Sequence, residues 1–177
     1  MINPGTKLPH FSAPACVGVE AGSEFATIDS AALEGQWNVL YTYPKDFTFV
    51  CPTEIVEFDR ILPELERRNA ALFGGSTDNE YSHLAWRRAD PQLQALRHPL
   101  LFFSFETAAS LGVLHPVEGV ALRATIITDP QGIVRFASAN ELSVGRNVDE
   151  VVRVLDALQT GELTACNWRP GQPVIQP

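Results

Sequence analysis

The chain has 177 residues, of which 45% are hydrophobic and 19% are charged, and its formal net charge is -8. This balance is typical of a folded globular protein and excludes a disordered or fibrous chain. The 13 Lys and Arg residues are outnumbered by 21 Asp and Glu residues and form no basic stripe, so we expect no nucleic-acid partner.

The length and the composition of individual segments limit the possible domain organisation and cellular compartment. The length predicts one domain over residues 1–177, with residues 162–177 as a C-terminal tail. The first residues, MINPGTKLPHFSAP, contain no apolar segment of the kind found in a secretory signal. No later segment stays apolar over the ~18 residues that a spanning helix needs. We therefore expect a cytoplasmic protein with no membrane partner, in which the three cysteines form no stapled scaffold.

The first half of the chain alternates between apolar runs and amphipathic stretches. Residues 37–43 (WNVLYTY) are aromatic and β-branched and predict a buried strand. Apolar residues at spacings of three and four predict a helix over residues 52–68, kinked at Pro63. Residues 71–75 then predict a short strand, and residues 80–89 predict a helix.

The second half continues the alternation and defines the fold class. Residues 100–104 predict a strand, and residues 124–128 and 133–137 predict a hairpin closed by an Asp-Pro-Gln-Gly turn. Asn147 can cap a helix that ends at Gly161. The pattern predicts an α/β fold with a mixed central β-sheet flanked by helices on both faces.

The stretch PKDFTFVCPTE, residues 44–54, places Cys51 where a strand and a loop lead into a helix. Pro52 suits the first turn, where its missing N–H costs nothing. The helix start offers unpaired N–H groups and about half a positive charge, which favour the nucleophilic thiolate. The Thr48 hydroxyl can reach the sulfur or the atom that it attacks, and Glu54 can accept from helix-start amides or bind an arginine.

Other candidates leave alternatives open. Free cysteines are usually buried hydrophobes, but the neighbours of Cys51 favour chemistry there. Arg123, before an apolar strand, belongs either in a structural ion pair or beside the thiolate. Arg146 is either a surface arginine or part of the site. Cys16 has no helix start or basic neighbour in the sequence, so we expect it to be packed or exposed, and idle.

The four histidines show no spacing that is typical of metal ligands, so we expect no metal site. They are His10, His83, His98 and His115. His83 and Trp86 lie three residues apart on a predicted helix, which more often indicates packing than catalysis.

Cys166 lies in TACNWRPG, after the last predicted helix. A thiolate that attacks a peroxide becomes a sulfenic acid, and a second thiol must condense with it before further oxidation. A cysteine in a tail can be idle, but a tail is also a suitable place for such a resolving thiol.

With these residues the chain resembles the typical two-cysteine peroxiredoxins, and among them the bacterial alkyl hydroperoxide reductase C type. The resemblance covers nearly the whole chain and rests on YPKDFTFVCPTE, STDNEYSHLAW, ALRATIITDPQGIVRF, GRNVDEVVRVLDALQ and ACNW. It implies a thioredoxin-like fold and the reduction of hydrogen peroxide and organic hydroperoxides. It also implies no metal or other cofactor.

The resemblance assigns roles to individual residues. Cys51 resembles the peroxidatic cysteine, with Pro44 shielding the site and with Thr48 and Arg123 holding the peroxide oxygens. Cys166 resembles the resolving cysteine, which in this family belongs to the neighbouring subunit. The supporting residues that the resemblance implies are Glu54, Arg146 and Trp86.

The family also implies partners and a conformational step. These are a homodimer, commonly assembled into a ring of five or six dimers, and an external dithiol or disulfide reductase as electron donor. The two cysteines can meet only if the first turn of the helix unwinds, so we expect low local stability there. The short segment ASLGVLHPVEG and the tail ending in VIQP imply resistance to over-oxidation of Cys51.

Two other classes of function remain as alternatives. A thioredoxin-like disulfide exchanger would normally carry Cys-x-x-Cys, but Glu54 occupies the place of the second cysteine. A ring-shaped holdase that binds unfolded chains stays open on the sequence alone.

Overall fold

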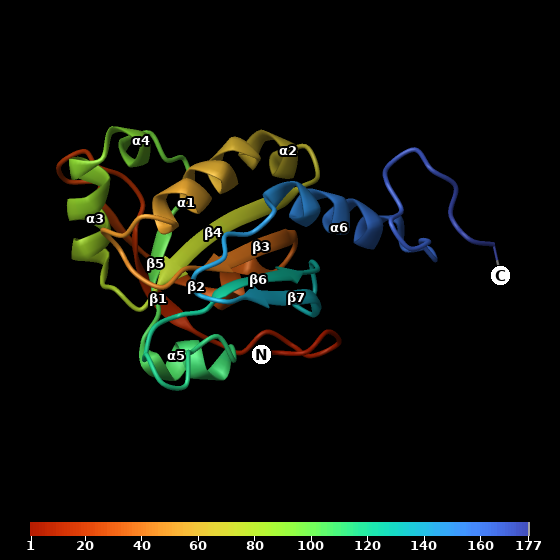
Figure 1. Ribbon diagram of the computed structural model, residues 1–177, viewed down its shortest axis with the longest axis horizontal. Helices are drawn as coiled ribbons and strands as arrows, with labels where there is room; N and C mark the ends of the chain where they lie inside the picture. Colours follow the sequence, from red (N-terminus) through yellow and green to blue (C-terminus); the bar gives the residue numbers. More distant parts are fainter. Residues whose placement is uncertain (177) are drawn as a thin grey trace.

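The computed structural model describes residues 1–176, which form a seven-stranded sheet with helices on both faces (Figure 1). The strand order is β2-β1-β5-β4-β3-β6-β7. Strands β3, β4 and β5 run parallel, and the other neighbouring pairs run antiparallel, so the expected mixed sheet is confirmed. The strands are β1 (Ser12–Cys16), β2 (Phe25–Asp29), β3 (Trp37–Thr42), β4 (Ala70–Ser76), β5 (Leu100–Phe102), β6 (Arg123–Thr128) and β7 (Val134–Asn140).

The helices divide between the two faces. Helices α1, α2 and α6 lie along one face, and α5 lies on the other, as Figure 1 shows. Within residues 1–176 no helix combines the length and the apolar character needed to cross a bilayer. The helices are α1 (Cys51–Arg60), α2 (Leu62–Glu66), α3 (Glu80–Ala89), α4 (Pro91–Gln94), α5 (Phe105–Ser110), α6 (Val148–Thr160) and the 3-10 turn η1 (Ser30–Leu33).

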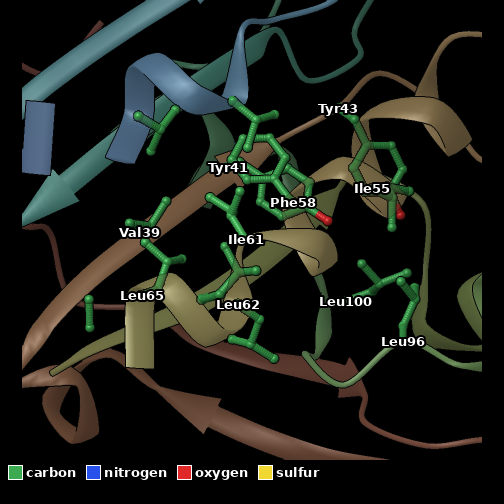
Figure 2. Close-up of a cluster of buried hydrophobic side chains, with 14 of the residues drawn as sticks. Val39, Tyr41, Tyr43, Ile55, Phe58, Ile61, Leu62, Leu65, Leu96 and Leu100 are labelled. Atoms are coloured by element: carbon green, nitrogen blue, oxygen red, sulfur yellow. The ribbon is translucent and has the colours of Figure 1, made fainter. Parts of the chain in front are cut away.

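Strand β3 lies between β4 and β6 and has apolar packing on both faces. Val39 and Tyr41 point into the core under α1 and α6, whereas Leu40 points into the second core, which includes residues of α5. The rings of Tyr41 and Phe58 stack with centroids 3.9 Å apart and planes 4° apart (Figure 2). This stack fixes α1 on the strand that leads into the candidate site.

The structure confirms most of the predicted elements and corrects two. The chain has two helices in place of one kinked helix over residues 52–68, because α1 ends at Arg60 and α2 begins at Leu62. Pro63 has no N–H to continue the α1 hydrogen bonds, and the helix breaks at Ile61, two residues earlier. The strand predicted over residues 100–104 ends at Phe102, because the Ser104 side chain caps α5.

The hairpin of β1 and β2 was not predicted. Strand β1 contains Pro14, which lacks a donor for the ladder, and β2 is largely exposed. Neither segment shows the alternation of apolar and polar residues that identifies a half-buried strand.

The tail leaves the end of α6 and folds on itself. Leu163 and Ile175 form an isolated bridge, and the Trp168 indole donates a hydrogen bond to the carbonyl of Gln172. Figure 1 shows this segment extending along the longest axis of the molecule, on the side away from the start of α1.

Candidate active site

Cys51 is the first residue of α1 and is 1% exposed. The residue before it, Val50, makes no side-chain hydrogen bond to the helix start, and Pro52 follows within the first turn. Because no side chain caps this end, the partial positive charge of the helix start acts on the sulfur. The predicted position of the thiol at a helix start is therefore confirmed.

Arg123 opens β6 and is buried beside the thiol. Its Nη1 lies 3.4 Å from the Cys51 sulfur and 2.6 Å from Oε2 of Glu54. Its Nε donates to the carbonyl of Leu142 over 2.6 Å. The two roles that the sequence left open are thus compatible, since one guanidinium both pairs with a carboxylate and contacts the sulfur.

Glu54 lies one turn after Cys51 and joins a second arginine to the cluster. Arg146 donates to the Glu54 carboxylate from its backbone N, from Nε and from Nη2, over 2.8–3.0 Å. Its guanidinium also lies over the rings of Tyr41 and Phe58. The Arg146 side chain is 5% exposed, so the alternative of a surface arginine is excluded.

The charges of this buried group do not cancel. Glu54 carries one negative charge against the two positive charges of Arg123 and Arg146, and the three side chains are only 3–5% exposed. Burial opposes ionisation of Glu54, but hydrogen bonds from Arg146 and Arg123 outweigh it and lower the pKa of the carboxyl. Burial likewise opposes the charge of Arg123, but its contacts with Cys51 and Glu54 raise its pKa. A thiolate at Cys51 would neutralise the remaining positive charge.

Thr48 and Pro44 belong to the loop before Cys51. The Thr48 hydroxyl donates to the carbonyl of Lys45 over 3.0 Å, which closes a turn within the loop. Pro44 is buried. Within residues 1–176, the Thr48 hydroxyl makes no hydrogen bond to the Cys51 sulfur. The role of Thr48 in holding a peroxide therefore stays a prediction.

Trp86, on α3, packs against the same loop. It is 4% exposed, and its ring centroid lies 6.2 Å from that of Tyr43 and 5.8 Å from that of Phe47. Phe47 has a positive φ of 54°, which is unfavourable for an aromatic residue. The tryptophan therefore supports a strained segment next to the thiol.

Cys166 is exposed and lies in the tail, and none of the three cysteines forms a disulfide within residues 1–176. Arg153 of α6 donates to the carbonyl of Trp168 over 2.9 Å and so holds the segment that carries Cys166. The structure does not bring Cys166 to Cys51 of the same chain, because the tail extends away from the start of α1 (Figure 1).

The surroundings of Cys16 differ from the expectation. The thiol is buried in β1, and Nη1 of Arg87 lies 3.8 Å from its sulfur. The sequence suggested no basic neighbour because Arg87 is 71 residues away along the chain. Burial raises the pKa of the Cys16 thiol, although Arg87 partly opposes the shift.

The sequence also missed a buried polar network under the loop. The Tyr43 hydroxyl and Nδ1 of His83 both contact the carboxylate of Asp46, at 2.9 and 2.8 Å. The backbone N of Asp46 donates to Asp78 over 2.7 Å. The available signal was Asp46 itself, an acidic residue in the short stretch before Cys51.

Comparison with known proteins agrees with this geometry. The AhpC/TSA family profile matches residues 4–137. The alkyl hydroperoxide reductase C of Mycobacterium tuberculosis is 46% identical over 97% of this chain and 92% of its own length. The thioredoxin peroxidase of Fasciola hepatica is 37% identical over 100% of this chain and 93% of its own length.

Solved structures give the same result. Mycobacterium tuberculosis AhpC has a TM-score of 0.86 at 43% identity, over 96% of this chain and 99% of its own. The reduced 2-Cys peroxiredoxin of Plasmodium vivax has a TM-score of 0.88 at 34% identity, over 97% of this chain and 91% of its own. These likenesses establish the thioredoxin-like fold, and the chain belongs to the AhpC/TSA family of peroxiredoxins.

Proposed function

We propose that this chain is a thiol-dependent peroxidase that reduces hydrogen peroxide and organic hydroperoxides, with Cys51 as the attacking group. The observation that carries the proposal is the Cys51 sulfur 3.4 Å from Arg123, at an uncapped helix start. The buried cluster keeps one uncompensated positive charge, which favours the thiolate. The names of the relatives, alkyl hydroperoxide reductase C and thioredoxin peroxidase, support the same activity.

The first chemical step forms one bond and breaks another. The Cys51 thiolate attacks one peroxide oxygen, an S–O bond forms, and the O–O bond breaks. The departing oxygen takes the electron pair and a proton and leaves as water or an alcohol. Arg123 and the amides of the helix start stabilise the negative charge as it moves from sulfur to oxygen. Thr48 and Pro44 complete the site, as a hydrogen-bonding group and a shield against water.

The second step consumes the Cys51 sulfenic acid. A Cys166 thiolate from a partner subunit attacks the oxidised sulfur, a disulfide forms, and water leaves. The placement of the tail away from α1 of its own chain supports a partner as the source. The first turn of α1 must open for this step, and the lack of a side-chain cap at Val50 favours such opening.

The remaining steps and the setting complete the proposal. An external dithiol or a disulfide reductase returns the disulfide to two thiols by exchange. The chain acts as one domain with residues 162–177 as the tail, assembled as a homodimer and further into a ring of five or six dimers. The free cysteines of residues 1–176 are consistent with a cytoplasmic enzyme.

Stopped-flow measurement of peroxide consumption tests the proposal. The wild type should react rapidly and Cys51→Ser should not, whereas Cys16→Ser serves as the control and should react like the wild type. Peroxide consumption that survives Cys51→Ser would overturn the proposal. A holdase would retain its protection of unfolded chains in the same variant, so an aggregation assay separates the two functions.

A further inference from the structure

His83 is fully buried and has no part in the proposed chemistry. Its two ring nitrogens contact two different elements of the fold. Nε2 lies 3.2 Å from the carbonyl oxygen of Leu101 on β5, and Nδ1 lies 2.8 Å from Oδ2 of Asp46 in the loop before Cys51. The imidazole therefore joins the loop to the body of the protein.

The partners of the His83 ring are a carbonyl oxygen and a carboxylate oxygen, and both accept hydrogen bonds. The other carboxylate oxygen of Asp46, Oδ1, accepts from the Tyr43 hydroxyl over 2.9 Å. The 2.8 Å contact between Nδ1 and Oδ2 is a hydrogen bond between the ring and the loop before Cys51.

This pair fixes the segment that presents Cys51. Asp46 is bound from three sides, by His83, by the Tyr43 hydroxyl and, at its backbone N, by Asp78. The next residue, Phe47, has the strained positive φ. A strained backbone persists only where surrounding contacts hold it, and Asp46 supplies the nearest buried ones.

We propose that His83 is a positioning residue for the peroxidase reaction. Through Asp46 it holds residues 44–51 in the conformation in which Cys51 meets peroxide. The inference rests on the proposed function. It adds that the contact between His83 and Asp46 controls the release of the loop for disulfide formation.

Two substitutions at His83 separate the two contacts of the ring. The side-chain amide nitrogen of His83→Asn takes the place of Nδ1 and can still donate to Asp46. That of His83→Gln takes the place of Nε2 and can donate only toward Leu101. His83→Gln should lower the rate constant for peroxide about tenfold, the size expected for one buried charge-assisted hydrogen bond, and His83→Asn should stay close to the wild type.

The fraction of Cys51 that is oxidised to sulfinic acid is a readout that a change in stability alone would not alter. A second peroxide can oxidise the sulfenic acid to sulfinic acid only while the loop stays folded, so mass spectrometry should find less sulfinic acid in His83→Gln than in the wild type. Thermal unfolding of both variants checks that they fold. Equal sulfinic fractions in His83→Gln and His83→Asn would overturn the inference. Activity that survives Cys51→Ser would instead contradict the proposed function, so the two failures are distinguishable.

Discussion

Cys51 and Cys16 are both buried and both accept a hydrogen bond from an arginine, but the Cys16 thiol donates a hydrogen bond as well. The Cys51 sulfur accepts from Arg123 over 3.4 Å. The Cys16 thiol also donates to the carbonyl of Gly18 over 3.4 Å, which requires the proton to stay on the sulfur. An accepted hydrogen bond favours the thiolate, and a donated one favours the thiol.

The two arginines also differ in how their donors are used. Arg87 directs its guanidinium at the backbone carbonyls of Cys16, Leu93 and Leu96, over 2.7–3.3 Å. Its contact with the Cys16 sulfur is longer, at 3.8 Å. Cys16 also lies within a strand, without the dipole of a helix start. A neighbouring guanidinium is therefore insufficient to make a cysteine reactive.

The largest difference should appear when each thiol is removed. Cys51→Ser should lower the rate of peroxide consumption by at least about 10³-fold, because a serine hydroxyl is not ionised at neutral pH. Cys16→Ser should leave the rate within a factor of about two, since the residue has no access to the site. Stopped-flow assays with purified proteins measure both, and comparable losses would mean that the contrast between the thiols is wrong.

The second test replaces the arginine beside each cysteine. Arg123→Gln should slow the peroxide step by about 10²-fold, the usual effect of removing one donor that stabilises developing charge. Arg87→Met should leave that rate nearly unchanged but destabilise the fold by about 3 kcal/mol, because three buried carbonyls lose their donor. Chemical denaturation and kinetics on the same samples separate the two effects. A large loss of rate in Arg87→Met would contradict the distinction between a catalytic Arg123 and a structural Arg87.

Glu54 provides an intermediate test with a pH signature. Its pKa is lower in the folded state than the usual value of 4.5, so its stabilising contribution is complete above that value. The contribution is lost as the pH falls through the lower folded-state value. The difference in Tm between the wild type and Glu54→Gln should therefore shrink in acid. A difference that stays constant down to strongly acidic pH would show that the carboxylate is not stabilised by its arginines.

Cys166 supplies a contrast between exposed and buried thiols. Cys166→Ser should allow one turnover of peroxide at the wild-type rate and then stop, because the Cys51 sulfenic acid has no partner thiol. Single-turnover and steady-state assays with a small dithiol test this outcome. Normal cycling in the variant would identify a different resolver.

The smallest effect is expected for removal of the buried Cys16 side chain. Cys16→Ala should destabilise the protein by only about 1 kcal/mol, since one sulfur atom leaves a small cavity. Native Cys16 should also resist alkylation, because burial raises the pKa of its thiol. Mass spectrometry after brief treatment with iodoacetamide checks the second point, and rapid labelling would show an accessible thiolate.

The sequence predicted the central elements because their signals are local. The bounds of α3 and the cap residues of α6, Asn147 and Gly161, match the structure, since helix period and cap chemistry are written in adjacent residues. The helix was expected to kink at Pro63 but breaks at Ile61, and the hairpin of β1 and β2 was missed. Both depend on how a proline is accommodated by neighbouring segments, which local pattern does not determine.

The site was predictable only in part. The position of Cys51 at a helix start follows from the short stretch around it, and the resemblance to the family pointed to Arg123 and Arg146. The contact of Arg87 with Cys16 and that of His83 with Asp46 each join segments 37 or more residues apart. Such contacts arise from the packing of α3 against the sheet, so one sequence without that packing could not reveal them.

The central claim is that the buried cluster of Glu54, Arg123 and Arg146 keeps Cys51 in the thiolate form. The ultraviolet absorbance of a thiolate at neutral pH, measured as the difference between reduced wild type and reduced Cys51→Ser, tests it most directly. The account predicts a thiolate band in this difference that weakens in Arg123→Gln. A wild-type difference spectrum without a thiolate band would contradict it.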